Sequence, residues 1–68
     1  MNEIVAPNVK RILRQKCLQQ AGIAKKAGYT PHQFSSMMNG RKMIKDVDVV
    51  NIAAALQVDA NELFKKGE

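Results

Sequence analysis

Acidic side chains are missing from most of this sequence. No aspartate or glutamate occurs between Ile4 and Lys45, and that stretch holds nine basic residues: Lys10, Arg11, Arg14, Lys16, Lys25, Lys26, Arg41, Lys42 and Lys45. The formal net charge is +5, although five acidic residues follow Lys45, namely Asp46, Asp48, Asp59, Glu62 and Glu68. A cationic front and an acidic back favour a polyanionic partner on one side. The alternative is a solvated surface whose charge is merely uneven.

Cysteine and long apolar runs are also scarce. Cys17 is the single cysteine, which excludes an internal disulfide and favours a reducing compartment. We expect it to pack rather than to react. The N-terminus lacks a basic start followed by a long apolar run, and no stretch approaches the roughly 20 apolar residues of a membrane span. We therefore expect a cytoplasmic protein with no membrane partner.

The residue groups of common catalytic and metal sites do not occur. His32 is the single histidine, and only one cysteine accompanies it, which is too few for a metal site. We find no carboxylate pair and no phosphate-binding loop. The sequence therefore predicts no enzyme activity, no metal, no cofactor and no small-molecule ligand.

Length and apolar content point to one small globular domain. Sixty-eight residues support only a thin core, and 46% of them are hydrophobic, which favours folding over disorder. Aromatic residues are few (Tyr29, Phe34 and Phe64), so the core depends on aliphatic and methionine side chains. We expect a single domain over residues 1–68, with residues 1–6 as a tail.

The stretch 18–40 organises the chain, and it begins with a helix predicted over residues 19–27. Ile23, Ala24 and Ala27 form one small apolar face. Gly28 then follows at the position where a left-handed cap usually ends a helix. Gly22, inside the helix, predicts close approach of another helix.

A second helix is predicted over residues 31–38. Thr30 is a suitable N-cap, and Pro31 suits the first helical position because its missing N–H costs nothing there. The apolar face consists of Phe34, Met37 and Met38, and Gly40 ends the helix. Two short helices around a glycine-containing turn form a helix-turn-helix unit, whose second helix can enter a DNA major groove.

Three further helices are predicted around this unit. They cover residues 9–17 with Asn8 as N-cap, 47–57 with Asp46 as N-cap, and 60–66 with a capping box between Asp59 and Glu62. Met43 and Ile44 are expected to return to the core, and Val50 to extend the buried stripe of its helix. The predicted core comprises Val9, Ile12, Leu13, Ile23, Phe34, Met37, Ile52, Ala53, Leu56 and Leu63, with Val49 in the same stripe.

These segments together resemble the Cro/repressor-type (XRE-like) helix-turn-helix family. The resemblance covers about residues 9–64 and depends on five separately spaced segments rather than on one strong motif. The matching residues are Leu18, Gln20, Ile23, Ala24, Gly28 and Thr30, then Met38, Asn39 and Gly40, then Ile52, Ala53 and Leu56, and finally Val58, Asp59, Glu62 and Leu63. The resemblance implies an all-α, five-helix, lambda-repressor-like domain.

The resemblance also implies which residues face DNA. The positions expected to reach base edges are Pro31, His32, Gln33 and Ser36. Those expected to contact phosphates are Gln20, Thr30, Ser35, Asn39, Arg41 and Lys42. An alternative for Gln33 is that its side chain only closes a capping box with Thr30, and an alternative for Gln20 is a solvent-exposed polar residue.

One departure from the family pattern concerns a charged pair. Many members carry an arginine on the first helix and a glutamate at the end of the third, and the matching positions here are Leu13 and Met38. Both charges are absent together, which is far less costly than losing one partner alone. We therefore expect Leu13 and Met38 to touch.

The resulting function is a sequence-specific regulator of the phage Cro/repressor type that binds double-stranded DNA. A weak homodimer through the last helix and the tail, with Leu63 and Phe64, is expected because short Cro-like proteins act on two half-sites. The alternative is a protein-interaction module on the same fold, such as an antitoxin-like or adaptor domain, with weak or no DNA binding.

Overall fold

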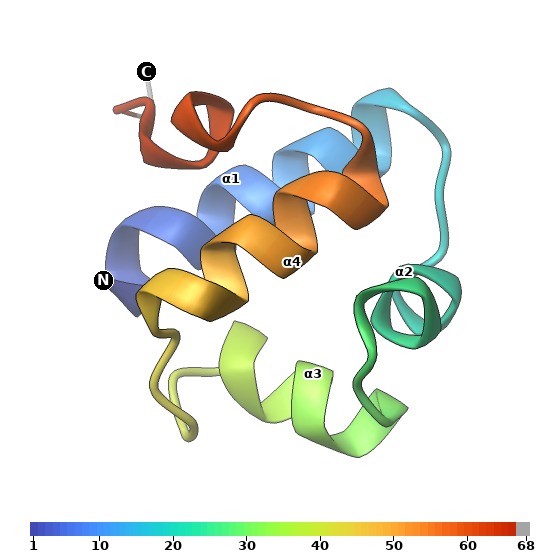
Figure 1. The fold of residues 1–68 in the computed structure, drawn as a ribbon. Coiled ribbons are helices and arrows are strands. Elements are labelled where there is room, and N and C mark those ends of the chain that lie inside the picture. The colour runs from blue at the N-terminus through green and yellow to red at the C-terminus, as the bar shows by residue number, and fades with distance from the viewer. Residues whose placement is uncertain (67–68) are drawn as a thin grey trace.

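The computed structural model describes residues 1–66, and all the regular structure in this part of the chain is helical (Figure 1). The elements are α1 (Asn2–Gln15), α2 (Gln20–Ala27), α3 (Pro31–Met38), α4 (Asp46–Leu56) and a short 3-10 helix, η1 (Ala60–Phe64). The all-α class is therefore confirmed. The expected fifth α-helix is a 3-10 helix instead, so the described residues contain four α-helices.

The first helix starts seven residues earlier than expected. Residues 2–6 are the opening turns of α1 rather than a tail, and Pro7 lies inside the helix. A proline there leaves the Glu3 carbonyl without its helical donor and costs about 3 kcal/mol. Val5 and Ala6 are buried, and burying a valine alone contributes about 1.5–3 kcal/mol. Burial of these side chains thus outweighs the local signal that predicted a helix start at Asn8.

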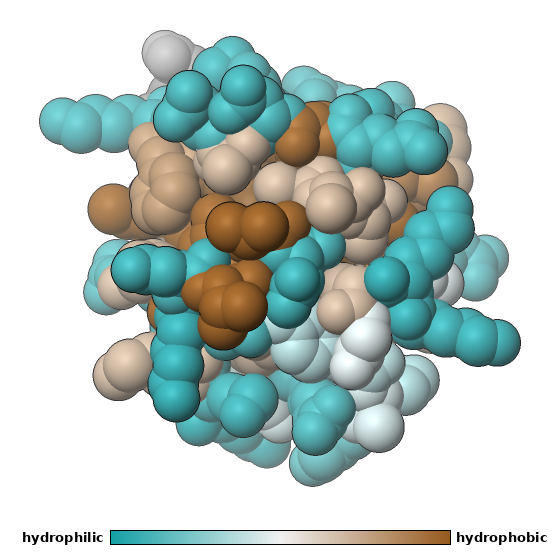
Figure 2. All heavy atoms as spheres, in the orientation of Figure 1, coloured by the Kyte–Doolittle hydropathy of each residue, from teal (hydrophilic) through white to brown (hydrophobic). Residues whose placement is uncertain are grey.

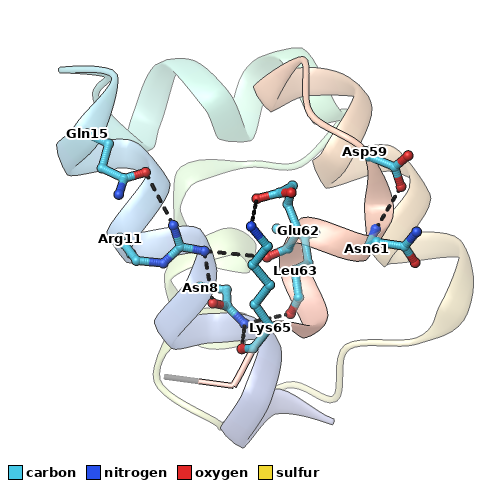
Figure 3. A network of polar contacts seen from close by, with 8 residues as sticks. All are labelled: Asn8, Arg11, Gln15, Asp59, Asn61, Glu62, Leu63 and Lys65. Carbon is cyan, nitrogen blue, oxygen red and sulfur yellow. Dashed lines mark hydrogen bonds and ion pairs between the residues drawn. The ribbon is translucent and has the colours of Figure 1, made fainter. Parts of the chain in front are cut away.

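Asn8 is a buried anchor, not the predicted N-cap. Its side-chain amide lies 3.0 Å from the Ile4 carbonyl oxygen. It also lies 2.9 Å from the carbonyl oxygen of Leu63 and 2.7 Å from that of Lys65 (Figure 3). Arg11 donates to the Asn8 side-chain oxygen and to the Glu62 carbonyl. Asn8 is the one buried polar residue among residues 1–66, and these bonds fasten η1 to α1.

The cap of η1 also differs from the predicted one. The Asp59 carboxylate accepts a hydrogen bond from the Asn61 N–H at 2.9 Å, while the Glu62 carboxylate pairs with Lys65 at 3.1 Å. The two side chains therefore do not form a reciprocal capping box. A 3-10 turn of five residues suffices here because Leu63, fully buried, anchors it between α1 and α4.

The hydrophobic core contains every residue of the predicted core list and Val49, but not Met43 or Val50. The buried set adds Val5, Ala6, Ala24, Met38 and Ile44 to that list. Two expectations for neighbouring residues are wrong: Met43 is 71% exposed, and Val50 is 61% exposed. Ile44 alone turns inward from the loop before α4, and the outer side of α4 carries Val50 because α1, α2 and η1 pack on the opposite side.

Each α-helix ends in the same backbone motif. Two hydrogen bonds close each helix. One N–H donates to the carbonyl oxygen five residues earlier, and the N–H of the residue before it donates to the carbonyl oxygen three residues earlier. This pair of bonds defines the Schellman motif. The residue with positive φ is Cys17 (56°) after α1, Gly28 (92°) after α2, Gly40 (80°) after α3 and Gln57 (60°) after α4. Two of these four positions therefore hold residues with a Cβ in a conformation that favours glycine.

Two smaller expectations about helices are also corrected. A Cβ placed on Gly22 would meet nothing within 4 Å, so no helix approaches it closely. Asp46 is the first residue of α4 and makes no capping hydrogen bond. The Asp48 carboxylate accepts from the Lys45 N–H at 2.9 Å instead, which satisfies a backbone donor that precedes the helix.

Candidate nucleic-acid interface

The candidate interface is the α2–turn–α3 unit. In Figure 1, α3 runs along the lower edge of the molecule and α2 lies at its right side. Gly28 has φ +92° and lets the chain reverse after α2, as the sequence predicted. Thr30 then caps α3: its hydroxyl accepts from the Gln33 N–H at 3.1 Å, and the Gln33 side-chain oxygen accepts from the Thr30 N–H at 3.0 Å. Both hydrogen bonds of the capping box are present, so the predicted box between Thr30 and Gln33 is confirmed, while a base contact by Gln33 stays a prediction.

This cap changes what Gln33 can do in a groove. Reading adenine through N6 and N7 requires both the oxygen and the amino group of the glutamine side chain. The Gln33 oxygen is already occupied by the Thr30 N–H. A bidentate base contact by Gln33 therefore either shares its oxygen, which has a second lone pair, between the Thr30 N–H and the base, or breaks the capping box.

All four base-contact candidates lie on the outer side of α3. Pro31, His32 and Gln33 are exposed and Ser36 is half-buried, whereas the opposite side is buried through Phe34, Met37 and Met38. The buried side fixes the rotation of α3 about its axis. Their contacts with DNA bases stay predictions.

The phosphate-contact candidates occupy the two flanks of α3. Gln20 begins α2 and is half-buried. No side chain caps the first turn of α2, so the free backbone N–H groups of that turn are open to an anion. After α3, Asn39, Arg41 and Lys42 are exposed. Thr30 is exposed beside the turn, and the Asn39 amide lies 3.4 Å from the hydroxyl of half-buried Ser35. Phosphate contacts by these residues stay predictions.

The loop after α3 is held by a residue that the sequence analysis assigned to a tail. The Asn2 amide donates to the Met37 carbonyl at 3.0 Å and to the Lys42 carbonyl at 2.7 Å, and the Asn2 oxygen accepts from the Ile44 N–H at 2.9 Å. One side chain thus ties both ends of the loop to the start of α1. Partners 35 to 42 residues apart leave no local signal in a sequence.

A second unpredicted contact holds the turn between α2 and α3. The Tyr29 hydroxyl donates to the Asp48 carboxylate on α4, and the Tyr29 ring stacks on Phe34 with centroids 6.3 Å apart. Partial burial, followed by the hydrogen bond to Asp48, raises the pKa of Tyr29 above its ordinary 10.0. Since Asp48 also accepts from Lys45, one carboxylate joins the turn to the end of the loop.

The electrostatics of this edge suit a polyanion. Among residues 1–66, the ion pairs are Glu3 with the N-terminal amine and Glu62 with Lys65. Neither pair involves α2, α3 or the following loop, so within residues 1–66 the exposed cations of these segments form no ion pair. Lys10 of α1 borders a hollow with Asn39 and Gly40, and Glu3 lines the same hollow, so α1 brings one cation and one carboxylate to this edge.

Metal and membrane sites find no support in the described residues. Within residues 1–66 no three His, Cys, Asp or Glu side chains gather as metal ligands. No helix in that range has both the length and the apolar character to cross a bilayer. The prediction that Cys17 packs is wrong, because its side chain is exposed at the left-handed position after α1.

Comparison with known proteins agrees with this geometry. Residues 11–63 match the family model of a helix-turn-helix domain. A similar solved structure is that of the restriction-modification controller protein C.AhdI from Aeromonas hydrophila, with a TM-score of 0.82 and 21% sequence identity over 94% of this chain and 100% of that chain. At this identity the likeness concerns the fold. No curated protein matches the chain.

Proposed function

This chain belongs to the helix-turn-helix domain family, and from that premise we propose that it is a sequence-specific DNA-binding transcription regulator of the phage Cro/repressor type. In this proposal α3 enters the major groove, and α2 with the loop after α3 holds the flanking phosphates. The observation that carries the proposal is the placement of exposed polar residues on one side of α3, between two segments, α2 and the loop after α3, that contain no acidic residue.

The proposed contacts divide into two classes by chemistry. His32 and Ser36 have side chains that hydrogen-bond base edges, and Pro31 offers only apolar contact, for example to a thymine methyl group. For a bidentate base contact, the Gln33 oxygen is either shared with the Thr30 N–H or released from it. Phosphates are held by Gln20, Thr30, Ser35, Asn39, Arg41 and Lys42, because amides, hydroxyls and cations all suit phosphate oxygens.

These classes predict different behaviour in a salt titration of DNA affinity. Arg41→Ala removes about one phosphate contact, so affinity for all sequences falls and the slope of log K against log salt flattens by about 0.9. His32→Ala costs about 1–3 kcal/mol on the preferred site only, with the slope unchanged. His32 tests base contact better than Gln33, because Gln33→Ala also removes the cap of α3.

The measurement compares a DNA fragment flanking the gene with random DNA, at several salt concentrations. Lys66→Ala is the matched control, since it removes one exposed cation from the hollow shared with Arg11 and Arg14 and is expected to leave the slope unchanged. Arg41→Ala is expected to weaken binding to both DNAs equally. If His32→Ala does the same, α3 does not read bases. If the wild-type protein shows no salt-dependent DNA binding, the protein-interaction module replaces this proposal.

A further inference from the structure

The loop between α3 and α4 carries exposed cations, yet its own residues do not bond one another. The cations are Arg41, Lys42 and Lys45. Within residues 1–66, no backbone hydrogen bond joins two residues of the loop 39–45. Figure 2 shows hydrophilic side chains at the lower left of the molecule, where this loop lies in Figure 1. Contacts with other parts of the chain must therefore fix its path.

Bonds to the two neighbouring helices hold only the ends of the loop. At its start, the N–H groups of Arg41 and Lys42 both donate to the Ser36 carbonyl, at 2.9 and 3.2 Å. At its end, the first turn of α4 binds the last N–H of the loop. Between these bonds the chain passes from Met43, which is 71% exposed, to Ile44, which is buried. This middle part carries the change of direction toward the core.

The Asn2 side chain holds this middle part. Its amide donates to the Lys42 carbonyl at 2.7 Å, and its oxygen accepts from the Ile44 N–H at 2.9 Å. The same amide donates to the Met37 carbonyl, in the last turn of α3, at 3.0 Å. In the described part of the chain, no other hydrogen bond reaches the backbone from the Lys42 carbonyl to the Ile44 N–H. One half-buried side chain from the first turn of α1 thus sets the spacing between α3 and the loop.

These bonds fix the backbone of a cationic residue on both sides. The Lys42 N–H is bound to Ser36 and the Lys42 carbonyl to Asn2. The Cα from which the lysine side chain leaves is therefore held relative to α3. Asn2 itself is uncharged, so its part in any binding of an anion is one of geometry.

We propose that Asn2 is a positioning residue for phosphate binding, because it holds the loop so that Arg41 and Lys42 reach the DNA backbone beside α3. This inference rests on the proposed function. A loop that is loose in the free protein must be ordered when DNA binds, and that ordering lowers affinity. A loop already held by Asn2 avoids this loss. The alternative is that Asn2 only stabilises the fold.

DNA affinity of matched variants separates these two roles. Asn2→Ala removes all three bonds and leaves the net charge unchanged. Val9→Ala is the control: Val9 is fully buried on the same helix, so its truncation lowers stability but removes no polar contact of the loop. A third protein carries Arg41→Ala and Lys42→Ala together, and a fourth adds Asn2→Ala to that pair. Affinity is measured for the fragment flanking the gene and for random DNA, at 50 and 200 mM salt, where circular dichroism shows each protein folded.

Asn2→Ala should weaken binding to both DNAs alike, by about threefold or more at 50 mM salt and by less at 200 mM. One phosphate contact changes affinity by about threefold over this range of salt. Val9→Ala should bind as the wild type does. In the protein that already lacks Arg41 and Lys42, adding Asn2→Ala should cause no further loss, because the side chains that it positions are gone.

Two results would overturn the inference while the proposed function stands. One is an affinity of Asn2→Ala equal to that of Val9→Ala. The other is an equal loss from Asn2→Ala with and without Arg41 and Lys42. A wild-type protein that shows no salt-dependent DNA binding is a different result, which removes the proposed function and this inference together.

Amide hydrogen exchange without DNA tests the hold on the loop directly. Exchange at the Ile44 N–H should be faster in Asn2→Ala than in the wild type, because its acceptor is lost. Val9→Ala should leave this exchange rate close to that of the wild type. An unchanged rate in Asn2→Ala would show that Asn2 does not hold the loop and would overturn the inference whether or not the protein binds DNA.

Discussion

The left-handed residue after α1 offers a direct test of how these helices end. Cys17 has φ +56° and is exposed, and it occupies the position that glycine fills after α2 and α3. A residue with a Cβ pays about 1–2 kcal/mol in this conformation, whereas glycine loses about 0.5–1 kcal/mol of additional chain entropy on folding. The difference predicts that Cys17→Gly raises the free energy of unfolding by about 0.5–1 kcal/mol.

Thermal denaturation is a suitable assay, because 1 kcal/mol shifts the midpoint of a domain this small by about 4–8 °C. Cys17→Gly should therefore raise the midpoint by several degrees. Cys17→Ser removes the thiol but keeps the Cβ, so it should leave the midpoint unchanged. Lys16→Gly is the second control, since Lys16 precedes Cys17 with φ −95° and gains nothing from glycine. If Cys17→Gly lowers the midpoint as Lys16→Gly does, backbone strain at this helix end is not the controlling term.

Three further predictions concern contacts within the domain. Leu13 and Met38 are both buried, so Leu13→Arg should lower the free energy of unfolding by about 3–5 kcal/mol. Adding Met38→Glu should recover part of this loss in a double-mutant cycle, whereas purely additive losses would show that the two positions do not face each other. Asn2→Ala should cost about 1–3 kcal/mol in chemical denaturation because it leaves the Ile44 N–H unpaired, while Asn61→Ala, a change at an exposed asparagine, serves as control. The raised pKa of Tyr29 adds stability that is complete below pH 10.0 and is lost as the pH rises through the raised value. Tyr29→Phe should therefore lose less stability than the wild type between neutral and strongly alkaline pH. Parallel plots of unfolding free energy against pH for the two proteins would contradict a raised pKa of Tyr29.

The helix-turn-helix unit could be predicted from the sequence because its determinants are local. Thr30 and Gln33 cap α3 from within one turn, and Gly28 reverses the chain directly after α2. Each determinant acts over a few bonds along the chain, so no knowledge of the remaining structure is needed. The apolar spacing of each helix likewise identified residues of the core, since the helical period alone decides which side chains share a side.

Where the prediction was wrong, partners distant in sequence outweighed a local signal. Pro7 and Asn8 resemble a helix start, yet burial of Val5 and the bonds from Asn8 to residues 63 and 65 extend α1 back to residue 2. Such contacts exist only once the helices have packed, because burial and long-range hydrogen bonds depend on which elements meet.

The sequence by itself determined an all-helical chain with a capped third helix and no acidic residue between Ile4 and Lys45, because propensity, capping and charge are properties of neighbouring residues. The tertiary structure alone decided that Asn2 holds the loop after α3, that Tyr29 bonds Asp48, and that Val47 and Val50 face outward. The rotation of α4 depends on the volume that α1, α2 and η1 leave for it. Close packing of those side chains fixes that volume, and no single segment of the sequence contains it.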